Sequence, residues 1–274
     1  MSKPEIDSDG FQIVSSKKSY KKNTLVPLNK QKFHKNEIKI DIEKSHRRIQ
    51  STVEELKDSE YLKSVIKAVS NVLKDRNIIE IICFGLGHIG ECNVSRYQLA
   101  FLLCLINCFK PQQVLVHDPI FYTDECELIK KFNLTLIEEN TEGTYIITNK
   151  GISLVYLPHC PKQLTNNFLW SNWGLNLENC ILLGNTFTSI IDSNSDRILT
   201  ETVPFIHKIH PLTYEVSLDN NFKYKDIFND TSIHYFSKEK LDSVTSDFWI
   251  NKDKPQYIDT VEFITSLMVD KLTV

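Results

Sequence analysis

Apolar side chains recur at helical spacing over residues 51–75, the first long patterned stretch of the chain. Ser51 stands three residues before Glu54, which is the spacing of a capping box at the start of a helix. The stretch therefore predicts an amphipathic helix, or two short ones. Its expected buried face carries Val53, Leu56, Val65, Val69, Val72 and Leu73.

After residue 77, short β-branched apolar runs alternate with helical patterns. The run IIEIICF at 78–84 ends at glycines, which predicts a buried strand followed by a tight loop. Strands that alternate with helices predict a single α/β domain with a Rossmann-like, doubly wound and mostly parallel sheet. Further strands are expected at 112–119, 133–139, 152–160, 180–187 and 232–236, and helices at 95–109, 124–132 and 161–173.

Two stretches lie outside this alternation. Residues 200–230 carry Pro204, Pro211 and several Asn, which predicts an irregular linker with one helix near 203–212. The first 50 residues hold twelve Lys and Arg against six Asp and Glu, so they are basic, while the whole chain has a net charge of −3. We therefore expect a flexible basic tail at 1–45 and a domain at 46–274 with an acidic surface.

Charge and composition narrow the classes of function. The basic tail either is a solvated segment or contacts nucleic acid, an acidic protein or anionic lipid, but the acidic body argues against sequence-specific nucleic-acid binding. No apolar run approaches the roughly 18 residues of a membrane span, and no apolar signal region is apparent. Seven scattered cysteines indicate a reducing compartment, so a soluble protein of the cytoplasm, and in addition the nucleus, is expected.

The candidate chemistry follows the strand ends. In a parallel sheet the carboxyl ends of the strands meet at one edge, where ligands bind. The residues expected at this edge are Gly85 and Gly87, Asp118, His159 and Cys160, and Gly184 and Asn185.

The loop GLGHIG at 85–90 has the spacing G-x-G-x-x-G of dinucleotide-binding loops. An acid that binds ribose usually follows such a loop by about 20 residues, whereas Asp118 lies 33 residues after Gly85. Three interpretations stay open: a dinucleotide, another adenosine-type ligand such as S-adenosylmethionine, or glycines that only permit a sharp turn.

His159 and Cys160 suggest a nucleophile and a base, but adjacent residues of an extended chain point in opposite directions, so direct activation is not expected. Metal binding would recruit His88, Cys92, Asp118 or His234, yet the chain has no C-x-x-C pair and no H-E-x-x-H helix, so no metal is predicted. In the structural alternative, His159 bonds to the backbone or caps the next helix and Cys160 packs as a small apolar residue.

Two further groups of polar residues have open roles. Asn166, Asn167 and Asn172 are poor helix formers within a predicted helix, so their amides are expected either to tie loops together or to line a polar pocket. Asp230 and His234 flank and enter the last strand, and Asp230 can start that strand through an Asx-turn.

Several motifs in order resemble the family called sensitivity to red light reduced, or the SRR-like domain. They are GLG before SRYQLAFLL, then DPIF, LPHC with LTNNFLWSNW, GNTF and DIFNDTSIHYF, between roughly residues 80 and 236. Length and composition suit a fungal member. The family pattern covers Gly85, Gly87, Arg96, Gln98, Asp118, Pro119, His159, Cys160, Asn167, Asn172, Trp173, Gly184, Asn185, Asp230, Ser232 and His234.

The resemblance implies a regulatory protein linked to microtubule stability in fungi, to light input and the circadian clock in plants, and to heme biosynthesis and clock control in animals. It brings no agreed biochemical activity. We expect a site for a small ligand or a protein partner at the carboxyl edge of the sheet, with the cofactor unknown. The alternative is a methyltransferase-like group-transfer enzyme with an adenosine-type cofactor. Its catalytic candidates are His159, Cys160, Asp230 and His234, and its cofactor-binding candidates are Gly85, Gly87, Arg96, Gln98, Asp118, Gly184 and Asn185.

Overall fold

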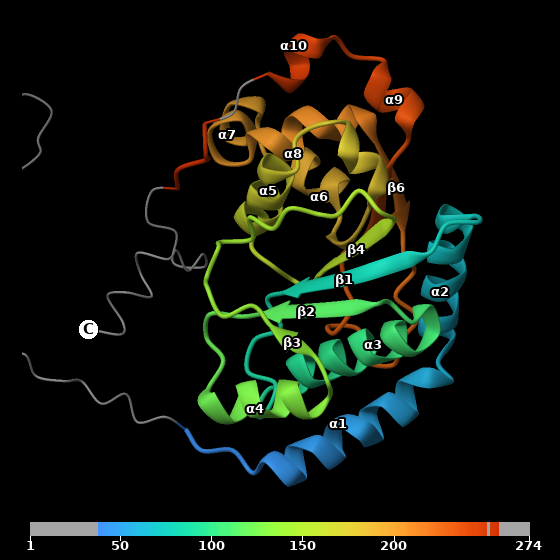
Figure 1. Ribbon diagram of the computed structural model, residues 1–274, viewed down its shortest axis with the longest axis vertical. Helices are drawn as coiled ribbons and strands as arrows, with labels where there is room; N and C mark the ends of the chain where they lie inside the picture. The colour runs from blue at the N-terminus through green and yellow to red at the C-terminus, as the bar shows by residue number, and fades with distance from the viewer. Residues whose placement is uncertain (1–37, 251–252, 258–274) are drawn as a thin grey trace, which may run out of the picture. The chain divides into compact units, whose positions relative to one another are not determined.

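A computed structural model describes residues 38–250 and 253–257 and gives an α/β fold built on a seven-stranded sheet (Figure 1). The strand order is β3-β2-β1-β4-β5-β7-β6. The strands are β1 (Ile78–Phe84), β2 (Gln113–His117), β3 (Thr135–Leu136), β4 (Ile152–Leu157), β5 (Cys180–Asn185), β6 (Thr213–Ser217) and β7 (Thr231–Phe236). The expected Rossmann-like, mostly parallel sheet is confirmed.

Ten α-helices lie in the described part of the chain. They are α1 (Ile42–Lys57), α2 (Glu60–Leu73), α3 (Asn93–Phe109), α4 (Thr123–Lys131), α5 (Lys162–Ser171), α6 (Phe187–Asp192), α7 (Asp196–Thr202), α8 (Pro204–Ile209), α9 (Lys238–Asp242) and α10 (Ser246–Trp249). None of these helices has the length and apolar character that crossing a membrane requires.

Strand direction changes at one side of the sheet. Strands β1 to β5 run parallel to one another, whereas β7 is antiparallel to both β5 and β6. The pattern of residues 232–236 predicted this last strand but not its direction, and β6 lies where an irregular linker was expected. The predicted helix in that linker is present as α8 and a following 3₁₀ turn, His210–Leu212.

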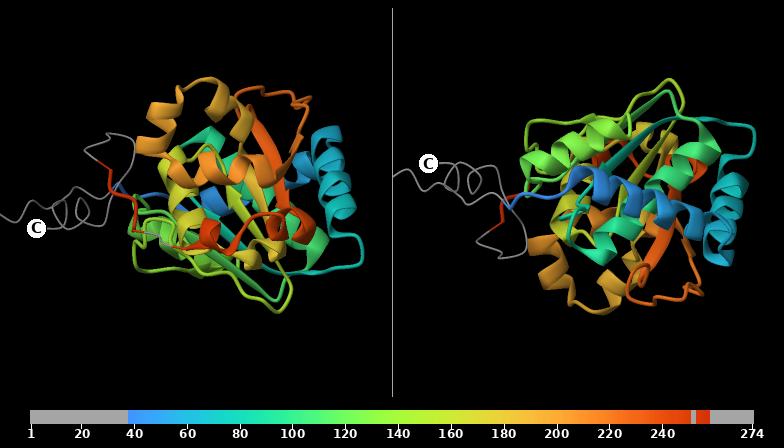
Figure 2. Two further views of the ribbon diagram at one scale, coloured as in Figure 1. Left: turned by 90° about the horizontal axis from the view of Figure 1, so that it is seen from above. Right: turned by 90° about the horizontal axis from the view of Figure 1, so that it is seen from below.

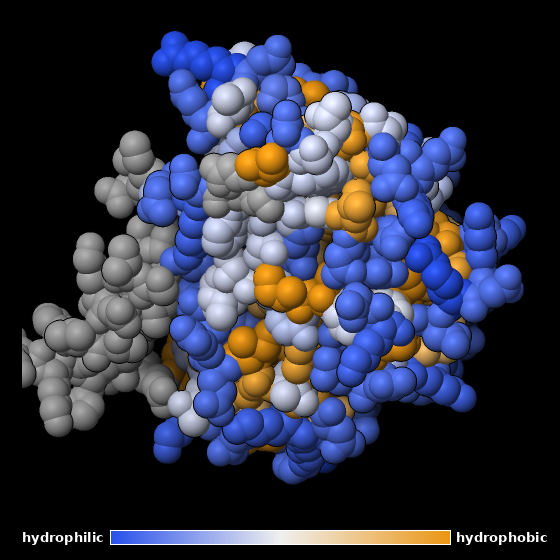
Figure 3. Space-filling view, turned by 45° about the horizontal axis from the view of Figure 1, so that its top comes forward, coloured by the Kyte–Doolittle hydropathy of each residue, from blue (hydrophilic) through white to orange (hydrophobic). Residues whose placement is uncertain are grey.

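The sheet separates two hydrophobic cores because successive side chains of a strand point to opposite faces. On one face, Ile81, Leu154 and Ile181 pack with α1, α2, α3 and α4. On the other face, their neighbours Ile82, Val155 and Leu182 pack with α5 and α8. Figure 2 shows the two layers of helices from above and from below. The surface seen in Figure 3 is hydrophilic over most of its area, with hydrophobic residues in small groups.

The predicted helical stretch 51–75 is two helices, and the first begins earlier than its pattern indicated. Asp41 caps α1, because its carboxylate accepts a hydrogen bond from the Lys44 backbone N–H at 2.9 Å. The chain just before α1 is attached to α4, since the Ile40 backbone N–H donates to the Asp124 carboxylate at 2.9 Å. Residues 1–37 of the expected basic tail lie outside the described residues.

A long connection between β3 and β4 is anchored by a buried carboxylate on β1. Glu80 is 1% exposed and accepts hydrogen bonds from the Gln113 side chain at 2.8 Å and from the Tyr145 hydroxyl and Thr148 backbone N–H at 3.0 Å. Its other partner is the Ser153 hydroxyl. These bonds compensate the cost of burying the charge and fix residues 145–148 against the sheet. Strand β3 itself spans two residues, far fewer than the expected 133–139.

Candidate functional site

The loop after β1 is held in its shape by the carboxylate that follows β2. Gly85 and Gly87 have φ angles of +77° and +70°, a region that favours glycine. One Asp118 oxygen accepts a hydrogen bond from the Gly87 N–H at 2.7 Å, and the other accepts from the Ile120 N–H at 3.0 Å. Burial raises the pKa of Asp118 despite these two bonds. Asp118 therefore joins the ends of β1 and β2.

Cys160 is packed against the same loop. Its Sγ lies 3.1 Å from the Phe84 carbonyl oxygen, to which the thiol donates, and the residue is 4% exposed. A Cβ atom added at Gly85 would lie 2.4 Å from this sulfur. Burial raises the pKa of the thiol well above its ordinary range, so Cys160 stays protonated at neutral pH. The arrangement is that of a packing residue and not of a nucleophile.

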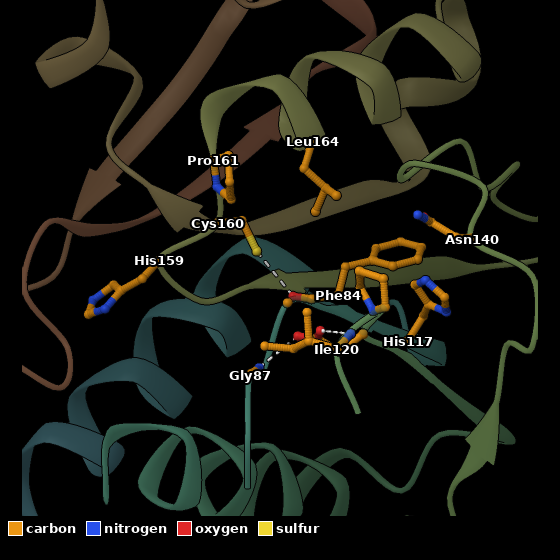
Figure 4. Close-up of a pocket in the computed structure, with 12 residues that line it drawn as sticks. Phe84, Gly87, His117, Ile120, Asn140, His159, Cys160, Pro161 and Leu164 are labelled. Atoms are coloured by element: carbon orange, nitrogen blue, oxygen red, sulfur yellow. Dashed lines mark hydrogen bonds between the residues drawn. The ribbon is translucent and has the colours of Figure 1, made fainter. Parts of the chain in front are cut away.

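His159 points away from Cys160 (Figure 4). Its backbone adopts a left-handed conformation with φ +48°, which turns the side chain toward other loops. Its Nδ1 lies 3.4 Å from the amide nitrogen of Gln98, and its Nε2 lies 3.2 Å from the Asn229 carbonyl oxygen. These contacts are satisfied together when Gln98 donates to Nδ1 and Nε2–H donates to Asn229. The imidazole thus ties α3 to the loop before β7.

A cavity of about 200 Å³ lies where the ends of β1, β2 and β4 meet. The structure brings five of the candidate catalytic and cofactor-binding residues to its wall, namely Gly85, Gly87, Asp118, His159 and Cys160. The rest of the wall is largely apolar, and Figure 4 shows Phe84, Ile120 and Leu164 around the same space. Strands β1 and β4 are the pair at which the chain reverses its progress across the sheet, the switch point where open α/β sheets bind ligands.

The remaining candidate residues lie outside this cavity. Asn185 and Asp230 line a wider hollow on the other side of His159 and Cys160. In it, the Asn185 amide donates to the Cys160 carbonyl at 2.9 Å, and Asp230 accepts from the Ser189 hydroxyl at 2.9 Å. Arg96 and Gly184 line neither space. Gly184 pairs with Ser232 in the sheet.

His234 is fully buried between β5 and β6. Its Nε2 lies 3.2 Å from a Glu215 carboxylate oxygen, its Nδ1 lies 3.3 Å from the Leu182 carbonyl oxygen, and its ring stacks on Phe187 with centroids 3.9 Å apart. Burial alone would raise the pKa of Glu215, but the hydrogen bonds from His234 and Thr188 outweigh it and lower that pKa. Both nitrogens of His234 therefore face groups of the protein itself.

Asn166 and Asn167 of α5, and Asn172 directly after this helix, tie loops together, as the first of the two interpretations proposed. The Asn166 side-chain oxygen accepts from the Phe205 N–H at 2.8 Å and so caps α8. Asn167 donates to the Glu142 carbonyl at 2.9 Å, and Asn172 accepts from the Ile147 N–H at 2.9 Å. Asn166 and Asn167 are fully buried, which explains why costly helix residues occupy these positions.

The residue that the sequence pattern missed is His117, the last residue of β2. It is 7% exposed and lines the 200 Å³ cavity as well as an adjoining hollow of about 350 Å³. Its Nδ1 lies 2.8 Å from the Ile137 carbonyl oxygen, while its Nε2 has no hydrogen-bond partner among the described residues. The available signal was a single imidazole at the end of the apolar run VLV, directly before Asp118.

The side chains considered as metal ligands do not form a metal centre in the described part of the chain. Across residues 38–250 and 253–257, no three His, Cys, Asp or Glu side chains gather with the geometry to hold a metal ion. His88 instead pairs with the buried Glu125, Nδ1 to carboxylate oxygen at 3.0 Å, and stacks on Tyr122.

Comparisons with known proteins agree with the motifs. An SRR1-like protein of Drosophila melanogaster is 27% identical over 266 residues, covering 94% of this chain and 93% of the relative. A mouse SRR1-like protein is 34% identical over 134 residues, which cover 48% of this chain and 53% of the relative. Protein SENSITIVITY TO RED LIGHT REDUCED 1 of Arabidopsis thaliana is 24% identical over 190 residues, 68% of this chain and 67% of the relative. The model of the SRR1 domain matches residues 49–235, so the chain belongs to the SRR1 domain family.

Proposed function

We propose that this protein regulates its partners by binding a small organic ligand in the cavity at the carboxyl ends of β1, β2 and β4. Membership of the SRR1 domain family makes it a regulatory protein of that family. The observation that carries the proposal is the convergence of Gly85, Gly87, Asp118, His159 and Cys160 on one cavity at the switch point of the sheet.

The hydrogen bonds at the rim support binding more than catalysis. His159, Asp118 and Cys160 each use their polar atoms to fix neighbouring loops. A general base or a nucleophile needs a polar atom that can reach a substrate, and a thiol whose pKa is raised by burial is a poor nucleophile. Such a rim is preorganised, so a ligand that fits it gains affinity without the cost of ordering loops.

The size of the cavity limits the ligand. Pockets for drug-sized molecules have volumes of roughly 300–1,000 Å³, whereas this cavity holds about 200 Å³. The adjoining hollow of about 350 Å³ shares His117, Asp118, Pro119 and Asn140 with it. A ligand group the size of one or two fused rings fits the first space, and larger ligands extend outward from it.

The cellular roles proposed here come from the family. In fungi the resemblance implies a part in microtubule stability, and in other organisms it implies circadian and heme-related regulation. The name of the Arabidopsis relative refers to sensitivity to red light. We propose a cytoplasmic and additionally nuclear protein whose ligand-bound form engages a protein partner.

A second candidate function is group transfer with an adenosine-type cofactor. The first five strands follow the order 3-2-1-4-5 of nucleotide-binding Rossmann sheets, which favours a nucleotide-like ligand at the ends of β1 and β2. Fold alone does not establish a reaction, and the candidates for catalysis, His159, Cys160, Asp230 and His234, contact other groups of the protein. The regulatory proposal therefore takes precedence.

A thermal-shift screen of a metabolite library tests the binding proposal. A ligand at 100 times its dissociation constant stabilises the folded state by about 2.7 kcal/mol, which is readily measured. Leu164→Trp fills the cavity, so we expect the variant to fold and to lose the shift. Ile146→Trp is the matched control, because Ile146 is 65% exposed and does not line the cavity. A shift that survives Leu164→Trp would place the ligand elsewhere and contradict the proposal.

A further inference from the structure

We propose that His117 recognises the amino group of an adenine-type base that occupies the 200 Å³ cavity. This inference rests on the proposed function, since it names the chemistry of the ligand that the cavity takes. Every rim side chain described above has a partner for its polar atoms, but the Nε2 of His117 has none among the described residues.

The contacts of His117 fix which nitrogen carries the proton. Nδ1 lies 2.8 Å from the Ile137 carbonyl oxygen, and a carbonyl oxygen can only accept a hydrogen bond. Nδ1 therefore bears the hydrogen in the neutral ring, and Nε2 presents a lone pair. A buried acceptor without a donor costs roughly 1–3 kcal/mol. Because Nε2 is itself buried, a ligand N–H group removes this cost when the ring turns toward the cavity, and the lone pair then accepts from that donor.

The walls of the cavity favour a ligand whose N–H donor is attached to a flat ring system. Phe84, Ile120 and Leu164 face the same space, and the Phe84 ring meets the His117 ring edge-on with centroids 6.3 Å apart (Figure 4). Such walls bind the apolar faces of a heteroaromatic base, while one polar atom at the edge fixes its orientation. A fused bicyclic base with an exocyclic amine meets both requirements.

The loops after β1 and β2 offer contacts for the sugar of an adenosine-type ligand. A carboxylate can accept about four hydrogen bonds, and Asp118 accepts two, from Gly87 and Ile120. The remaining lone pairs of Asp118 can accept ribose hydroxyls. Gly85 and Gly87 line the cavity next to Asp118. The base would lie beside His117 and the sugar beside Asp118.

Three nucleosides that differ at one group provide the test. Adenosine carries the amine, purine riboside has hydrogen in its place, and N6,N6-dimethyladenosine keeps the nitrogen without an N–H donor. Affinities for the full-length protein are measured by isothermal titration calorimetry, and the affected resonances by NMR. We expect adenosine to bind at least about tenfold more tightly than either analogue, equivalent to about 1.4 kcal/mol.

Substitutions of His117 test whether the preference for adenosine depends on the imidazole ring. His117→Leu removes the acceptor, so adenosine and purine riboside should bind equally. His117→Gln keeps an amide oxygen that can accept, so it should restore part of the preference, and His210→Phe is a control outside the cavity lining. Thermal unfolding checks that each variant folds. If His117→Leu does not fold, His117→Gln and the binding of the three nucleosides to the wild-type chain still test the role of His117.

The outcomes separate this inference from the proposed function. Equal binding of adenosine and purine riboside to the wild type, or a preference that persists in His117→Leu, overturns the role of His117 but leaves a ligand cavity. Failure of all three nucleosides, together with a different metabolite that stabilises the wild type and not Leu164→Trp, overturns the adenine-type ligand alone. If no metabolite stabilises the protein, both proposals fail.

Discussion

Gly85 is the residue at which the candidate site is least tolerant of change. An added Cβ would lie 2.4 Å from the Cys160 sulfur, well inside contact distance, and the backbone has φ +77°. Gly85→Ala therefore combines a steric clash with a strained backbone. We expect the free energy of unfolding to fall by about 2–4 kcal/mol, measured by urea denaturation.

The clash and the backbone strain can be separated with a second substitution. Cys160→Ala removes the sulfur, so the double variant should be more stable than the sum of the two single changes predicts. Gly174→Ala is the control, because no atom lies within 4 Å of its added Cβ. Strict additivity of Gly85→Ala and Cys160→Ala would mean that the loop moves away from Cys160 and that the described packing is wrong.

Residue by residue, the sequence predicted some roles and could not predict others. It indicated that His159 does not activate Cys160, because neighbours in the chain point apart. It could not indicate that Gln98 and Asn229 hold the His159 ring, since they lie 61 and 70 residues away in the chain. His117 was missed for the same reason, because its cavity exists only after β1, β2 and β4 come together.

At the scale of elements, hydrophobic periodicity predicted the strands and helices whose signal lies in consecutive residues. Strands β1, β4 and β5 are largely apolar and buried along nearly their whole length, which makes them easy to recognise. Strand β6 was missed because four of its five residues are at least partly exposed and the strand pairs only with β7 at the sheet edge. The start of α1 was missed because Asp41 and Ile42 lie in a stretch whose charges resembled those of a tail.

Residues 253–257 lie far from helix α5 in the chain but are attached to it through Tyr257. The Tyr257 hydroxyl lies 2.8 Å from the Asn166 amide nitrogen, which donates to it, and 2.8 Å from the Asn167 amide oxygen, which accepts from it. Tyr257→Phe removes this partner of two fully buried amides, so we expect a loss of about 1–3 kcal/mol in unfolding free energy. Amide hydrogen exchange should increase in α5.

The exposed neighbour Gln256 provides the control for this substitution. Gln256→Ala should leave both the unfolding free energy and the exchange of α5 unchanged. If Tyr257→Phe behaved like Gln256→Ala, residues 253–257 would not stabilise α5. The side chains of Asn166 and Asn167 would then need other hydrogen-bond partners.

For the whole molecule, the sequence predicted the fold class because strand–helix alternation leaves few topologies. It also predicted that Gly85, Asp118 and His159 would meet at one edge, since parallel strands end on the same side. The antiparallel insertion of β7 between β5 and β6 was not encoded in any local pattern. That insertion places Asp230 and His234 beside β5 and away from the cavity, which separates them from the other candidate residues.

Alkaline pH should destabilise the whole fold through its buried tyrosines. Burial raises the pKa of Tyr61 and Tyr156 in the folded chain. An unfolded tyrosine loses its proton near pH 10. Above that pH the unfolded chain therefore binds fewer protons than the folded one, and each such tyrosine lowers the unfolding free energy by about 1.4 kcal/mol per pH unit.

Tyr156 isolates this effect because its hydroxyl is buried without a hydrogen-bond partner in the described part of the chain. Tyr156→Phe keeps the packing, so stability at pH 7 should be unchanged or slightly higher. Between pH 10 and 12 the decline in unfolding free energy should be shallower than in the wild type by about 1.4 kcal/mol per pH unit. Urea denaturation at steps of pH measures both slopes, with Tyr214→Phe on the exposed edge strand as control. Parallel slopes for Tyr156→Phe and the wild type would mean that Tyr156 ionises equally in the folded and unfolded chain.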